Sequence, residues 1–280
     1  MATDTSKITG AADELSAGLA KGGTAAKTLG AEIANAIKSL DGRVAALESG
    51  GVTPEPPNPN PGPNPPPAGT IPLTWDDPMF ANVRTGVEGW PSGTGWTIEN
   101  ASFKSTGKDA MVGGQGSFNL DIVRMQGREG IRVSGPGTIN INRTYVETTG
   151  TQDDHADGLQ AYKPGASGTI NITNSTFRSH DTHATAGVWV SDNYGATLNL
   201  TNVVFHGGPY GLRCKTVNGS LPIKVACKDV FFVGPFLYGE VLFEATTAPI
   251  TITQWENVCH ATIVNGQLVP GEPMSKPPIH

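Results

Sequence analysis

The stretch Ile170-Asn171-Ile172-Thr173-Asn174-Ser175-Thr176-Phe177 decides the fold, because it recurs along the chain. A close copy is Leu198-Asn199-Leu200-Thr201-Asn202-Val203-Val204-Phe205, and weaker copies begin at Ile98, Ile139 and Val225. Each copy alternates apolar and polar residues, as a half-buried strand does, and then reaches an asparagine or an equivalent residue. Asparagine tolerates the left-handed backbone region, so this position predicts a tight bend. The expected bend positions are Asn100, Ile122, Arg143, Asn174, Asn202, Asp229 and Asn257.

A second unit, in which glycine is followed by two apolar residues that flank one variable residue, marks another strand of each repeat. Its copies are Gly130-Ile131-Arg132-Val133, Gly158-Leu159-Gln160-Ala161, Gly187-Val188-Trp189-Val190 and Gly211-Leu212-Arg213-Cys214. Two short strands per repeat cannot bury their apolar faces alone, but stacked parallel repeats share one continuous core. We therefore expect an all-β domain, a right-handed parallel β-helix, over residues 71–280. An antiparallel sandwich is the alternative, although it would not explain why Asn and Gly recur at fixed phases of one period.

Two segments of different composition precede this domain. Residues 53–70 form a proline-rich linker, which favours extended polyproline II. Residues 1–52 are rich in Ala, Lys, Glu and Leu and predict a helical stem. Apolar residues in the stem are spaced four and three apart, which is the heptad pattern of a coiled coil, and charged residues occupy the flanking positions that pair between helices. The residues of this run are Ile33, Ile37, Leu40, Arg43, Val44, Leu47 and Glu48.

Two signals conflict on how many chains this coiled coil joins. β-branched Ile37 and Val44 at the a positions, with Leu40 and Leu47 at the d positions, favour two chains. The segment 43–48 resembles the short Arg-to-Glu motif of trimeric coiled coils, and on that resemblance we expect a homotrimer. A single amphipathic helix packed on another surface is the alternative.

The overall composition argues against several classes of function. The formal net charge is −6, whereas a nucleic-acid-binding protein needs a basic face. The sequence contains no run of about 18 apolar residues, so it predicts no membrane insertion. The first residues lack the basic-then-apolar order of a secretory signal. Three cysteines cannot form a disulfide framework, and an odd count fits synthesis in a reducing cytoplasm.

Four stretches resemble a known family, and the match covers roughly residues 95–215: Asp153 to Gln160, Ile170 to Phe177, Ala184 to Asp192 and Leu198 to Tyr210. The family comprises right-handed, pectate-lyase-like β-helix proteins of actinobacteria and of the tailed phages that infect them, where the phage members are called minor tail proteins. The recurrent Asn at the bend also resembles the asparagine ladder of pectate-lyase-like β-helices. The resemblance implies a virion tail or fibre protein, made in the host cytoplasm, whose residues 1–50 contact other virion proteins.

One stretch of the predicted helix carries candidate catalytic chemistry. Residues one coil apart in a parallel stack lie about 4.8 Å apart, so an acidic stretch and the histidine-containing stretch one coil later would meet. Paired carboxylates there could act as acid and base on a glycosidic bond, or with bound calcium could support β-elimination. A loop network of Asp and His without catalysis is the alternative, because a basic residue for a lyase and the full motif set of a hydrolase are missing. The candidates are Asp153, Asp154, His155, Asp157, Asp181 and His183, with His180 beside them.

A second candidate surface lies on the strands that begin with glycine. Side chains alternate in direction along a strand, so the variable residue of each unit is expected to point away from the core. A row of aromatic, amide and basic side chains can stack on and hydrogen-bond an extended glycan. The alternative is a solvated face or a contact with a neighbouring subunit. The candidates are Arg132, Gln160, Trp189 and Arg213, with Tyr162 and Lys215 beyond them.

These patterns predict a structural virion protein whose β-helix contacts host-surface polysaccharide. The alternative is a polysaccharide depolymerase, either a glycoside hydrolase or a lyase, on the same β-helix. No cofactor is required by the first function, whereas the lyase would use calcium.

Overall fold

The computed structural model describes residues 66–67, 69–107, 109–150, 156–180, 184–191, 193–217 and 221–280. They belong to the second of two compact units into which the chain divides, Gly62–His280. The predicted coiled-coil residues lie outside the described residues; these are Ile33, Ile37, Leu40, Arg43, Val44, Leu47 and Glu48.

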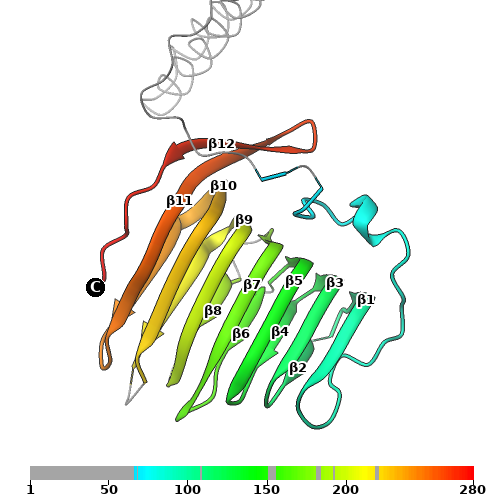
Figure 1. Cartoon of the computed structure of the whole chain (residues 1–280), viewed down its shortest axis with the longest axis horizontal. Helices are drawn as coiled ribbons and strands as arrows, with labels where there is room; N and C mark the ends of the chain where they lie inside the picture. The colour runs from blue at the N-terminus through cyan, green and yellow to red at the C-terminus, as the bar shows by residue number, and fades with distance from the viewer. Residues whose placement is uncertain are drawn as a thin grey trace, which may run out of the picture. The chain divides into compact units, whose positions relative to one another are not determined.

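The described part is all-β apart from one 3-10 helix, η1 (Pro78–Phe80). Its strands run in chain order as the colours of Figure 1 show. They are β1 (Trp96–Lys104), β2 (Ala110–Gly114), β3 (Phe118–Gly127), β4 (Glu129–Val133), β5 (Gly137–Thr148), β6 (Leu159–Ala161), β7 (Ala166–Ser179), β8 (Ala186–Val190), β9 (Tyr194–Thr216), β10 (Ile223–Ala245), β11 (Ile250–Val264) and β12 (Gln267–Pro273).

The strands stack in parallel, coil upon coil. Strands β1, β3, β5, β7, β9, β10 and β11 pair in that order, and β2, β4, β6 and β8 pair in a second series that continues onto β9. Register joins Ile98 to Leu120, Leu120 to Ile141 and Ile141 to Ile172, so these coil lengths are those that the repeats predict. The expected β-helix is therefore confirmed as a parallel β-solenoid.

The predicted bends are confirmed at every position. The backbone takes positive φ values between 46° and 59° at Asn100, Ile122, Arg143, Asn174, Asn202, Asp229 and Asn257. Each bend divides a long strand into two, so that the solenoid has three faces. We call the portions before the bend sheet A, the portions after it sheet B, and the series β2, β4, β6, β8 with the last parts of β9 and β10 sheet C.

Equivalent apolar side chains of successive coils stack on one another in the interior and form continuous rows. Phe177, Phe205 and Phe232 form such a row, with successive ring centroids 6.1 Å and 5.2 Å apart. Glycine at the start of each sheet C strand lies against this row. A Cβ on Gly158 would lie 2.3 Å from the carbonyl oxygen of Gly187 and 2.8 Å from the ring of Phe177, so only glycine fits there.

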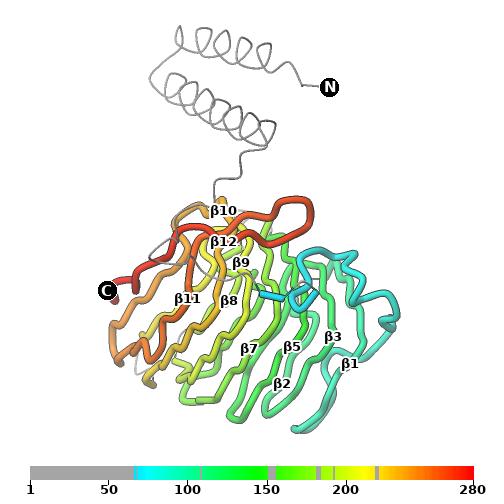
Figure 2. Tube along the Cα trace, turned by 45° about the horizontal axis from the view of Figure 1, so that its top comes forward, coloured from blue at the N-terminus to red at the C-terminus, as the bar shows by residue number. Residues whose placement is uncertain are grey.

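Segments outside the repeat cover both ends of the stack. Before β1, the chain bridges to the first coil: the amide of Arg84 donates to the carbonyl of Asn100, and the amide of Ser102 donates to the carbonyl of Arg84. After β11, strand β12 turns back antiparallel, and the tail returns so that the amide of His280 donates to the carbonyl of Phe243. Figure 2 shows the cyan entry segment and the red β12 segment crossing over the strands.

Candidate functional site

The predicted row of variable residues is present in register on sheet C. Arg132 of β4 pairs with Gln160 of β6, Gln160 with Trp189 of β8, and Trp189 with Arg213 of β9. Between them the apolar residues of each strand are buried in the core, so the row lies on the outer side of the sheet.

The exposure of the row differs from the expectation of an open platform. Gln160 and Trp189 are each only 8% exposed, so the two central members offer little surface to a polymer. Arg132 and Arg213 at either side are partly exposed, and Tyr162, on the neighbouring row, is 41% exposed. The accessible part of the predicted surface is therefore its margins.

Arg213 contacts several side chains at the more accessible margin of the row. Its guanidinium lies 5.2 Å from the ring centroid of Trp189 and 5.7 Å from that of Tyr210. Tyr210 in turn lies 5.7 Å from Tyr238 of β10, which is 67% exposed. We call Trp189, Tyr210, Arg213, Lys215, Tyr238 and Glu244 the Arg213 patch.

Glu244 fixes the cations of the Arg213 patch. Its Oε2 accepts from Arg213 Nη2 at 2.9 Å, and its Oε1 lies 3.3 Å from Lys215 Nζ. Burial acts to raise the pKa of Glu244, but the hydrogen bonds and charges of Arg213 and Lys215 outweigh it and lower that pKa. The carboxylate is thus ionised at neutral pH and holds the guanidinium of Arg213 close to the two aromatic rings.

Two carboxyl groups stand one coil apart at the start of sheet C. The carbonyl of Asp157 accepts from the amide of Gly130, which places Asp157 beside Glu129 of the preceding coil. Asp157 is fully buried, and its Oδ1 accepts from the amide of Ala186 at 2.8 Å, while Oδ2 has no hydrogen-bond partner in the described structure.

The environments of the two carboxyl groups differ. Burial raises the pKa of Asp157 well above its usual value, and the nearby charge of Glu129 adds to this, so Asp157 is protonated over a wider pH range. Glu129 is 2% exposed, but Arg132 Nε and Nη2 donate to its Oε1 at 2.8 Å and 2.5 Å. A protonated acid thus stands beside an ion-paired carboxylate, which is the arrangement that general acid and base pairs use.

A further polar cluster lies on sheet B, just before the chain turns toward sheet C. Glu147 accepts from Tyr145 Oη at 2.9 Å and is paired with His180. Burial acts to raise the pKa of Glu147, but the hydrogen bonds from His180 and Tyr145 prevail and lower it. Burial lowers the pKa of His206 to about 4, and the nearby cation of Arg178 adds to this. His206 is therefore neutral at physiological pH.

Several predicted site residues cannot be placed. Asp153, Asp154, His155, Asp181 and His183 lie outside the described residues, so their approach to Asp157 stays a prediction. In the described ranges, no group of three or more His, Cys, Asp or Glu side chains is arranged to hold a metal ion.

The sequence interpretation did not name Arg178, His206 or Tyr210 as site residues, and it missed five further residues of these clusters. Glu129 had a readable signal, because an acidic residue precedes the sheet C glycine both at Glu129-Gly130 and at Asp157-Gly158. The other four become neighbours only through strand register and cross-row contacts; they are Tyr145, Glu147, Tyr238 and Glu244.

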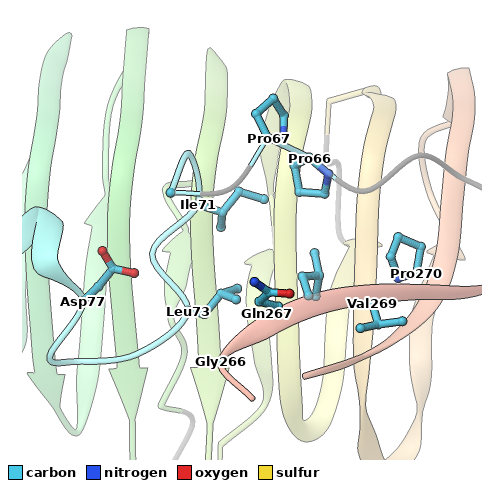
Figure 3. A pocket seen from close by; sticks show the side chains of 11 residues that line it. Pro66, Pro67, Ile71, Leu73, Asp77, Gly266, Gln267, Val269 and Pro270 are labelled. Carbon is cyan, nitrogen blue, oxygen red and sulfur yellow. The ribbon is translucent and has the colours of Figure 1, made fainter. Parts of the chain in front are cut away.

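An apolar groove of about 460 Å³ lies away from these clusters, between the entry segment and β12 (Figure 3). Ile71 and Leu73 from one side and Leu268 and Val269 from the other line it. Asp77, at its edge, is engaged in accepting from the amide of Met79 at 3.0 Å. The groove brings together no acid and base pair.

The three cysteines are buried thiols without disulfide bonds: Cys214, Cys227 and Cys259. Burial raises the pKa of each thiol, that of Cys227 to about 12, so they remain protonated and act as small apolar side chains. Within the part of the chain that the structure describes, no helix has the length and apolar character to cross a lipid bilayer.

Comparison of the chain with the models of protein families, with curated proteins and with solved structures finds no match. Functional argument therefore rests on the residues and on the resemblance that their motifs carry.

Proposed function

We propose that this chain is a structural, adhesive virion protein whose β-solenoid binds glycans of the host surface through the Arg213 patch. The observation that carries the proposal is the stacking of Arg213 on Trp189 and Tyr210, beside the exposed ring of Tyr238. Aromatic faces bind the C–H faces of sugars, and a held guanidinium donates to their hydroxyl and carboxylate groups.

The location on a virion is supported by the resemblance of residues 95–215 to phage minor tail proteins. In this proposal the stem, residues 1–52, forms a homotrimer and docks on other virion proteins, and residues 53–70 separate the solenoid from the particle. The particle surface is the working location, after synthesis in the host cytoplasm. Sedimentation of the full chain, compared with a variant carrying Ile37→Asp and Leu40→Asp, tests the stem: a trimeric mass is expected only without the substitutions.

Binding is tested with purified host cell-wall polysaccharide. Tyr238→Ala and Arg213→Ala should each weaken binding at least about fivefold, because each removes roughly 1 kcal/mol of stacking or hydrogen bonding. Lys276→Ala, which removes an exposed charge elsewhere, is the matched control and should bind as the unaltered chain does. Equal binding by folded Tyr238→Ala and Arg213→Ala chains would remove the patch from the proposal.

Depolymerase activity is the second candidate, and the Asp157–Glu129 pair favours it. A protonated Asp157 can act as general acid, and an ionised carboxylate nearby can act as base or nucleophile on a glycosidic bond. Full burial of Asp157 weighs against this function, because a general acid must reach the glycosidic oxygen.

The second candidate is tested by incubating the full chain with host polysaccharides, with and without calcium. New reducing ends indicate hydrolysis, and unsaturated sugars, which absorb in the ultraviolet, indicate elimination. Either product, if it is lost in Asp157→Asn, establishes the depolymerase and overturns the purely adhesive function.

A further inference from the structure

The outer face of sheet A carries uncharged polar side chains in straight rows. Along one row, Thr138 of β5 pairs with Thr169 of β7, and Thr169 with Thr197 of β9. Two residues further along the strands, a parallel row consists of Asn119, Asn140, Asn171 and Asn199.

The asparagine row is locked by its own hydrogen bonds. The Nδ2 atoms of Asn140, Asn171 and Asn199 each donate to the Oδ1 atom of the asparagine one coil earlier, all at 2.8 Å. Each amide nitrogen has two N–H groups and uses one of them in the row, so the second remains available to a ligand. Because the amides are already ordered, binding costs little side-chain entropy.

A shallow groove of about 550 Å³ runs across the coils along the threonine row. Gly137, Gly168 and Ala196 form part of its lining and keep the backbone accessible, while Leu221 and Pro222 supply an apolar side. Among the described residues, the hydroxyl groups of Thr138, Thr169 and Thr197 have no hydrogen-bond partner. The groove therefore combines free hydroxyl groups with an apolar contact, as sites for sugars do.

Charge is absent from the centre of this face and present only at its ends. Asp121 lies in an early coil, and its carboxylate is engaged with Arg143. Lys224 of β10 follows Thr197 in the threonine row and lines one end of the groove, and Lys228 lies further along the same strand. An anionic polymer would find no cation opposite its repeating charges along β5, β7 and β9, so a neutral ligand is favoured.

We propose that this groove binds a single extended chain of a neutral polysaccharide, lying across the strands, as a second glycan site separate from the Arg213 patch. Successive coils repeat at about 4.8 Å, which is close to the rise of one hexose in an extended β-linked chain. Each sugar would thus meet one threonine hydroxyl and one ordered asparagine amide, and Leu221 and Pro222 would contact its C–H face.

The test uses the full chain with a soluble, uncharged β-linked glucan in affinity electrophoresis, and polygalacturonate as the charged counterpart. The double variant Thr169→Val with Thr197→Val keeps the shape of the strands but removes two hydroxyl groups. Two lost hydrogen bonds should weaken glucan binding by about tenfold or more. The matched control is Thr247→Val with Thr262→Val, which are exposed threonines away from the threonine row, and it should change binding less than about twofold.

Serine variants keep the test informative if the valine variant folds poorly. Thr169→Ser with Thr197→Ser retains both hydroxyl groups and should bind the glucan within about threefold of the unaltered chain. Lys276→Ala, at an exposed position outside both glycan sites, should leave glucan binding unchanged. Undiminished binding by the folded valine variant overturns the proposal. So does an unaltered chain that binds only polygalacturonate, or one that uses this face to associate with a second copy of itself.

Discussion

Sheets A and C are built from the same coils, yet their outer faces differ in how side chains find partners. On sheet A, Asn140 and Asn171 bond to the equivalent residue one coil away, and the row stays exposed or half-buried. On sheet C, Arg213 crosses rows to reach Tyr210, Trp189 and Glu244, and the centre of the face is buried. Side chains that repeat from coil to coil therefore form the regular surface of sheet A. Side chains that do not repeat form the charged and aromatic Arg213 patch on sheet C.

If this contrast is correct, substitutions should cost most where sheet C meets the core and least on the open face of sheet A. The predictions that follow test that order, beginning with the largest expected effect.

Gly158→Ala should be the most damaging change. Its Cβ would overlap the carbonyl oxygen of Gly187 and press on Phe177, so the coil must shift, at a cost of about 3 kcal/mol or more in the free energy of unfolding. Gly165→Ala is the control, because Gly165 has φ 75° with no atom within 4 Å of the new Cβ, and backbone strain alone costs about 1–2 kcal/mol. Urea unfolding measures both. If both variants lose the same free energy of unfolding, the close approach of the coils at Gly158 does not add to the cost of a Cβ there.

Asp157 should give sheet C a pH dependence. Its pKa is higher in the folded chain than in the unfolded chain, where it is about 3.9. Folding therefore favours the protonated form, and stability should fall as pH rises from about 4 toward the raised folded pKa.

Asp157→Asn should remove this slope, because it keeps an acceptor for the amide of Ala186 and has no charge. Thermal unfolding should show that the stability of the variant relative to the unaltered chain is greater at pH 8 than at pH 5. Asp157→Ala should instead lose about 1–3 kcal/mol by leaving that amide unpaired. Parallel pH profiles for Asp157→Asn and the unaltered chain would contradict the raised pKa.

Arg213→Ala should cost less, about 1–2 kcal/mol. It removes two cation–π contacts and two charged hydrogen bonds to Glu244 at a partly exposed site, where solvent weakens each of them. Arg213→Lys keeps the charge but loses the flat guanidinium, so it should restore only part of the stability. Calorimetry compares the two. Full restoration by lysine would mean that charge, and not stacking, holds the patch together.

Asn171→Ala should be the mildest change, at about 0.5–1 kcal/mol. It breaks two hydrogen bonds of the row, and water replaces both because the face is open. Asn174→Ala, three residues later, should cost more, because Asn174 has φ 49° at the bend, where alanine is tolerated less well than asparagine, and because its half-buried side chain also makes two hydrogen bonds, to Asn142 and from Asn202. The difference between these two variants in urea unfolding measures what the bend adds to the row. If both variants lose the same free energy of unfolding, asparagine stabilises the solenoid through the row on the open face and not through the bend.

The same contrast explains what could be predicted from the sequence. The bends at residues such as Asn174 and Asn202 were predicted correctly, because a left-handed backbone favours asparagine there, whereas the bends at Ile122 and Arg143 were predicted from the spacing of the repeats alone. The register of Arg132, Gln160, Trp189 and Arg213 was also predicted, since it follows from the spacing of the glycines.

The burial of Gln160 and Trp189 could not be read in this way. Alternation along a strand gives the direction of a side chain but not what covers it, and the cover depends on segments that differ from coil to coil. Glu147 and His180 illustrate the same limit, because 33 positions separate them and no repeat relates one to the other.

The two covered ends have a consequence for how such a chain can change in length. Neither the bridge of Arg84 to the first coil nor the return of β12 and His280 to the last uses a residue from the middle of the stack. A whole coil duplicated or deleted between β5 and β9 would keep the bridge at Arg84 and the return of β12, and would move them apart or together by about 4.8 Å. The segment before β1 would have to change in length with it, because Asn202 donates to Thr70 and Ile71 packs with Val204 and Phe231. The coils are in this sense modular, and the entry segment that crosses them sets how many coils it can span.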